Sequence, residues 1–137
     1  MNLSFREKGL WLMFVSLIAT FVFYFARVLP SSAADVEPRQ VASFVLAVAI
    51  LVIVAIGGHI VVAIVDRRTA ADERDRLVEL KGRSNASYVL ATGVFLALCI
   101  ALLTTGTFLF THVLLGFWVL SQLVDIGSQL YLLRQGA

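Results

Sequence analysis

The stretch VASFVLAVAILVIVAIGGHIVVAIV, residues 41–65, decides the fold class of this chain. It contains no Asp, Glu, Lys or Arg along its whole length. The hydrocarbon core of a bilayer is about 30 Å thick, and an α-helix needs roughly 20 apolar residues to cross it. Lipid offers the backbone no hydrogen bonds, so a segment of this kind satisfies its own backbone as a helix. The stretch therefore predicts a transmembrane helix.

The same reasoning, applied outward along the chain, predicts four spans at residues 9–29, 40–65, 84–103 and 108–133. Hydrophobic residues make up 60% of the chain and charged residues 15%, whereas soluble domains average about 45–50% and about 25%. The first segment also resembles a signal peptide, but its apolar region is longer than the usual stretch of roughly 7–15 residues, so we expect it to be retained. We expect residues 1–137 to form one all-α membrane domain, an antiparallel four-helix transmembrane bundle.

The distribution of Lys and Arg predicts the orientation of these spans, because cytoplasmic loops carry an excess of both. Four spans place the N-terminus, the connector at residues 66–83 and the C-terminus on one side. Of the 11 basic residues, that side holds Arg6, Lys8, Arg67, Arg68, Arg74, Arg76, Lys81, Arg83 and Arg134. The other side holds only Arg27 and Arg39. We therefore expect a multi-pass protein of the plasma membrane with both termini in the cytoplasm.

The connector at residues 66–83 is dense in charge. Asp72 with Arg76, and Glu79 with Arg83, are acid-before-base pairs at i,i+4, which support a helix. Gly82 is typical of a helix stop or bend. We predict a short amphipathic cytoplasmic helix between the second and third spans, or an extension of the second span.

Two leucines, Leu77 and Leu80, lie among these charges together with Arg74 and Arg76. One interpretation is a docking surface for a cytoplasmic partner or for anionic lipid. The alternative is a solvated, self-paired linker that only enforces topology.

The fourth span carries an aspartate, Asp125, nine residues before Arg134 and thus about 13 Å from the inner end. Carboxylates inside a bilayer usually face the bundle interior or water, and often mark function. At 100° per residue, the polar side chains of this half-helix fall within an arc of about 120°. They are Ser121, Gln122, Asp125, Ser128 and Gln129. This intramembrane polar face is expected to contact other helices, a second subunit or a wet cavity.

His59 in the second span lies at a depth close to that of Asp125, so we predict a His59–Asp125 hydrogen bond. One interpretation makes this polar face structural, fixing how the helices pack. The other lets Asp125 take and release protons, coupled to transport or pH sensing. A third places Asp125 at the inner headgroups or at a partner interface.

Other features are weaker. His112 lies near the outer end of the fourth span, opposite the polar face, and is expected to be interfacial. Gly93, Ala97 and Ala101 form a small-residue ladder that favours close helix contact. Cys99 is the only cysteine. We find no nucleophile–base set, metal cluster or nucleic-acid signal, and we expect no enzyme, no cofactor and no metal.

Three segments give the chain a wider resemblance. They are Glu7-Lys8-Gly9-Leu10-Trp11, the run Asp72-Glu73-Arg74-Asp75-Arg76 followed by Tyr88, and the fourth span from His112 through Gly127. Together they resemble the uncharacterised small bacterial four-span membrane proteins of the DUF2178-like family. The resemblance implies the same topology and a location in the bacterial inner membrane, and it implies no activity.

Two functional hypotheses follow from the sequence. The first is a non-enzymatic regulatory, accessory or interaction protein. Its partners would be the lipid bilayer and either a second copy of the chain, in a homodimer, or another membrane or cytoplasmic protein. The alternative is a small proton-coupled transporter or channel that works as a homo-oligomer with Asp125 in its path.

Overall fold

The chain forms four long α-helices in the computed structural model, which describes residues 5–31, 33–65 and 73–135. They are α1 (Phe5–Val28), α2 (Pro38–Val65), α3 (Glu73–Leu103) and α4 (Phe108–Gln135). No strand occurs in the described residues. Each helix is long and apolar enough to cross a membrane. The predicted all-α fold with four candidate spans is therefore confirmed.

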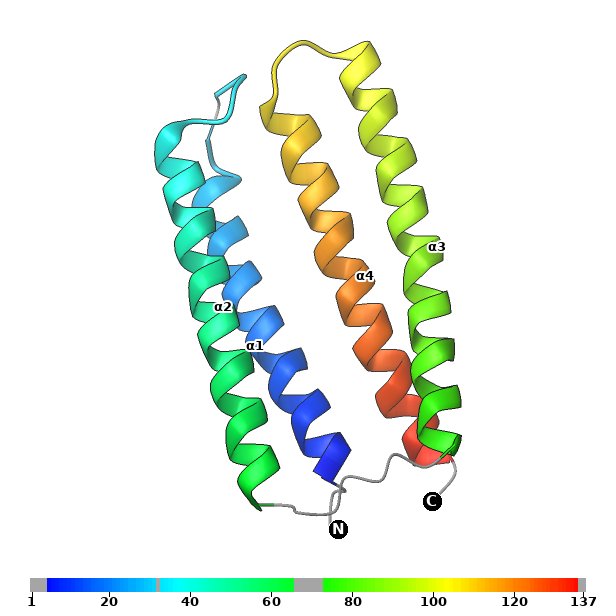
Figure 1. The fold of residues 1–137 in the computed structure, drawn as a ribbon. Coiled ribbons are helices and arrows are strands. Elements are labelled where there is room, and N and C mark those ends of the chain that lie inside the picture. Colours follow the sequence, from blue (N-terminus) through cyan, green and yellow to red (C-terminus); the bar gives the residue numbers. More distant parts are fainter. Residues whose placement is uncertain (1–4, 32, 66–72, 136–137) are drawn as a thin grey trace.

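The helices form two antiparallel pairs, α1 beside α2 and α3 beside α4 (Figure 1). The pairs meet where α1 packs against α4. At one end of the bundle α1 and α3 begin and α2 and α4 finish; we call it the charged end. At the opposite end, the loop end, short connections join α1 to α2 and α3 to α4. The short link at residues 104–107 makes α3 and α4 antiparallel neighbours, as the sequence predicts.

The structure corrects the prediction of a separate cytoplasmic helix. Residues 73–83 form the first turns of α3, which continues without a break into the third span. Gly82 does not stop this helix; it is buried within it. A glycine inside a helix costs only about 1 kcal/mol relative to alanine, so packing against α4 outweighs its breaking tendency. The predicted partner Asp72 and the rest of residues 66–72 lie outside the described residues.

The two connections are tied to each other at the loop end. The backbone N–H and the hydroxyl of Thr107 both donate to Asp35 Oδ1, at 2.9 and 3.1 Å. The Phe108 N–H donates to the carbonyl of Ala34 at 3.1 Å. Gly106 has a φ of 93°, a left-handed conformation that favours glycine, and a side chain there would collide with the Ala34 carbonyl. This turn therefore fixes the loop end of both helix pairs.

The buried core lies between α1 and α4. It comprises Leu17, Phe21, Tyr24, Val28 and Val119. Much of the remaining apolar surface points outward, and Ile53 and Leu102 remain 69% and 85% exposed. In water such a surface would be a strong liability, whereas lipid tails match it.

Small residues let α3 and α4 approach closely. Gly93 and Ala97 are both buried, and a Cβ at Gly93 would overlap the Phe117 ring. Two members of the predicted ladder thus lie in the helix contact, while Ala101 is exposed.

We expect Gly93→Ala to destabilise the protein by about 1–3 kcal/mol, because the added methyl overpacks the contact with Phe117. The control is Gly57→Ala, where an added Cβ meets nothing within 4 Å. Unfolding in mixed micelles, followed by circular dichroism, measures both. Equal midpoints for the two variants would contradict the close α3–α4 contact.

Candidate functional site

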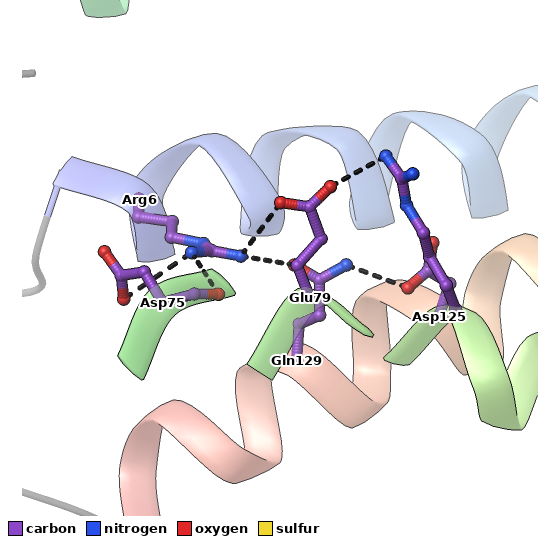
Figure 2. A network of polar contacts seen from close by, with 6 residues as sticks. Arg6, Asp75, Glu79, Asp125 and Gln129 are labelled. Carbon is purple, nitrogen blue, oxygen red and sulfur yellow. Dashed lines mark hydrogen bonds and ion pairs between the residues drawn. The ribbon is translucent and has the colours of Figure 1, made fainter. Parts of the chain in front are cut away.

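A network of polar side chains joins three helices at the charged end (Figure 2). Its centre is Arg6, in the first turns of α1. Arg6 Nη1 donates to the backbone carbonyl of Asp75 at 2.8 Å, and Nη2 donates to Gln129 Oε1 at 3.0 Å. The same guanidinium lies 3.5 Å from an Asp75 carboxylate oxygen and 3.9 Å from one of Glu79. One arginine therefore links α1 to the first turns of α3 and the last turns of α4.

The network continues along α4 to Asp125. Gln129 Nε2 donates to Asp125 Oδ1 at 2.8 Å, one helical turn away. The Gln129 amide accepts a hydrogen bond from Arg6 and donates one to Asp125. Its dipole is therefore oriented favourably between the guanidinium cation and the carboxylate. The half-buried Asp125 thus has a partner on its own helix and a positive charge beyond it.

Gly82 explains how α3 covers this carboxylate. A Cβ on Gly82 would lie 2.6 Å from Asp125 Oδ1 and 2.7 Å from Gln129 Cγ. Any side chain there would have to displace Asp125 or Gln129. Gly82, which the sequence analysis treats as a helix breaker, is therefore the residue that lets α3 pack closely against the polar face of α4.

Two further residues of the predicted polar face, Ser128 and Ser121, also have partners in the protein. Asn85 on α3 donates to the Ser128 hydroxyl at 3.2 Å. Ser121 is buried and donates to the Trp118 carbonyl at 2.8 Å within α4. Gln122 is half-buried. The face does contact another helix of the same chain, which is the first of the options that the sequence leaves open.

The predicted partner His59 lies on α2, but its side chain is outside the described residues. The His59–Asp125 hydrogen bond therefore stays a prediction. Asp125 Oδ1 accepts the Gln129 amide proton, and the second carboxylate oxygen, Oδ2, can accept from another donor.

Of the predicted docking residues, Leu77 and Leu80 lie on the side of α3 opposite Asp75 and Glu79, and Arg74 and Arg76 lie on the flanks. Arg74 and Arg76 are exposed, and Leu77 and Leu80 are 56% and 55% exposed. Val78 and Gly82 are buried, and Gly82 lies against Asp125 and Gln129 of α4. One face of the first turns of α3 therefore packs against the bundle, and the other face is exposed at the surface of the single chain.

A second polar contact, near the loop end, is absent from the sequence predictions. His112 lies near the loop end of α4, as expected, but it is buried, at 5% exposed. Its Nδ1 lies 2.8 Å from the Phe108 carbonyl and its Nε2 lies 3.2 Å from the Tyr24 hydroxyl. A carbonyl only accepts, so Nδ1 carries a proton, and a neutral ring then accepts the tyrosine proton at Nε2. Tyr24 comes four residues before the end of α1, and His112 comes four residues after the start of α4. The two residues therefore lie at the same depth in the bundle, and this is the signal in the sequence from which their contact could have been predicted.

No protein-family model matches this chain, and no curated protein or solved structure shows significant similarity to it. The four helices define it as a candidate multi-pass membrane protein. Among the described residues, no group of three His, Cys, Asp or Glu side chains is arranged to hold a metal ion. Chemically, the network at the charged end is a clamp that joins three helices through shared protons and charges.

We expect Arg6→Gln to lower the free energy of unfolding by roughly 1–2 kcal/mol, since it removes charge-assisted hydrogen bonds whose partners are partly solvated. The matched control is Arg74→Gln on the exposed face of α3, expected to change stability by less than about 0.5 kcal/mol. Thermal midpoints in detergent measure both. Equal losses would show that Arg6 acts only as another surface charge.

Proposed function

We propose that this chain is a non-enzymatic interaction protein of a bacterial inner membrane, which binds a protein partner through the cytoplasmic start of α3. Both termini then lie in the cytoplasm, and the charged end of the bundle is the cytoplasmic end. The excess of Lys and Arg at that end supports this orientation. We also propose that the chain is related to the DUF2178-like proteins, and this relation would imply the bacterial location.

The length of α3 is the observation that carries the proposal. Its 31 residues extend about 46 Å at 1.5 Å per residue, whereas the hydrocarbon core is about 30 Å thick. If residues 84–103 fill the core, the first eleven residues project about 16 Å beyond it. These are the charged residues 73–83, which belong in water or at headgroups.

The projecting turns are held rigidly on one side and exposed on the other. Val78, Gly82 and the Arg6 network fix them to the bundle. Leu77 and Leu80 face outward, more than half exposed. Two large apolar side chains so presented on a fixed helix are typical of helix-in-groove recognition.

The direction of α3 favours a protein over a lipid surface as the occupant. An amphipathic helix binds lipid by lying in the plane of the interface. Residues 73–83 instead continue the axis of the span, so their leucines cannot all reach the acyl boundary. Arg74 and Arg76 are exposed on these turns, so the partner that fits is a cytoplasmic protein with an apolar groove and acidic residues around it.

We expect Leu77→Glu combined with Leu80→Glu to abolish co-purification of the cross-linked partner, because both anchors become charges that repel an acidic rim. Cross-linking in native membranes, followed by mass spectrometry, identifies what is attached. The control is Leu103→Glu, an equally drastic change at the opposite end of α3, where the side chain is 83% exposed. Partner binding that survives the double substitution removes this surface from the proposal. If the cross-linked partner is a second copy of this chain, the surface is a homodimer interface instead.

The alternative function is proton-coupled transport by a homo-oligomer with Asp125 in the path. The observation that favours it is a half-buried carboxylate within a candidate span. The Gln129 bond and the close approach of Gly82 favour a fixed structural carboxylate instead, because they hold Asp125 in the contact between α4 and α3.

We expect proteoliposomes with Asp125→Asn to dissipate an imposed pH gradient at the same rate as wild type, both matching protein-free vesicles. Asparagine retains an oxygen that accepts the Gln129 amide, so the variant tests proton carriage with little change in packing. Asp125→Leu, which removes the acceptor, is expected to lower stability in detergent. Proton flux in wild type that disappears in Asp125→Asn would establish the transport alternative.

A further inference from the structure

The loop end of the bundle has a polar bowl between α1 and α2, with a volume of about 600 Å³. Arg27 comes from the last turn of α1, and Arg39 and Ser43 come from the first turns of α2. Ser31 contributes from the connection between these helices. The two arginines are the only basic residues that the sequence places at this end.

The charge of this bowl favours an anion. None of the ion pairs among the described residues includes Arg27 or Arg39. The Arg27 guanidinium lies over the Phe23 ring, 4.4 Å from its centroid, a contact that leaves its positive charge unneutralised. One carboxylate, Glu37, also lines the bowl. The other nearby acid, Asp35, accepts both Thr107 protons instead.

An apolar groove of about 380 Å³ continues from this bowl along α1 and α2. The two share Arg27 and Ser43 as lining residues. The groove reaches Ile50, eleven residues beyond Arg39 on α2, or about 16 Å toward the centre of the bundle. Small side chains at Ala19 and Ala47 open it, and Phe23 and Leu46 form its walls.

We propose that this bowl and groove bind an anionic phospholipid. The headgroup phosphate accepts from Arg27 and Arg39, whose guanidinium groups suit bidentate contact with phosphate oxygens. One acyl chain follows the groove between α1 and α2. A free phosphate ion would use the bowl alone, so the joined apolar groove identifies the occupant as lipid. The proposal needs the four helices to lie in a membrane and does not depend on the cytoplasmic partner.

Native mass spectrometry of the detergent-solubilised full chain, titrated with phosphatidylglycerol or phosphatidylcholine, tests the headgroup contacts. We expect Arg27→Gln combined with Arg39→Gln to weaken phosphatidylglycerol binding at least tenfold, because the headgroup phosphate loses both of its charged donors. The matched control is Arg74→Gln with Arg76→Gln, which removes two exposed arginines at the charged end. Equal affinity of wild type for both lipids, or equal loss in both double variants, would overturn the proposal.

The apolar groove is tested separately. Ala19 is exposed, so Ala19→Trp fills the groove without disturbing the core, and we expect it to weaken phosphatidylglycerol binding severalfold. The control is Ala91→Trp, at an exposed position on α3 that does not line the groove. Thermal midpoints verify that every variant is folded. Full binding by Ala19→Trp, or displacement of the lipid by inorganic phosphate at equal concentration, would show that the bowl binds anions without an acyl chain.

Discussion

Hydrocarbon gives no hydrogen bonds, so every polar group that a span carries into it has to find its partner within the protein. The architecture of this bundle follows from that constraint. Asp125 is bonded to Gln129, Gln129 is bonded to Arg6, and α3 covers both through Gly82. Each contact requires a particular helix to lie at a particular height and rotation, so satisfying one carboxylate positions three of the four helices.

Near the loop end, the hydrogen bond between Tyr24 and His112 positions α1 against α4. The contact between these two helices therefore has a polar group pair toward each end and an apolar core between them. The hydrophobic effect is weak between helices in lipid, so packing and such hydrogen bonds decide which helices associate. It follows that α1 and α4 form the central contact of the bundle, with α2 packed on α1, and with α3 packed on α4 and bonded to α1 through Arg6.

The sequence alone predicts the four spans well, because length and apolar content determine them without reference to any neighbour. It also predicts that the face around Asp125 turns toward other helices, a second subunit or a wet cavity, and the choice among these needs the packed structure. It fails where three-dimensional packing decides the outcome. Gly82 is a breaker by local propensity, yet a close helix contact keeps it inside α3. The burial of His112 against Tyr24 is not foreseen, because the two residues are 88 positions apart in sequence. Arg6 likewise gives no sign, before the helices are placed, that it will reach Gln129.

The bond between Asp125 and Gln129 has a consequence for the order in which the protein assembles. Both residues lie on α4, one turn apart, so the contact can form as soon as that helix does. The carboxylate is then partly shielded while α4 enters the bilayer, before α1 has docked against it. Insertion of the last span therefore does not have to wait for the tertiary fold, and Arg6 completes the network when α1 docks.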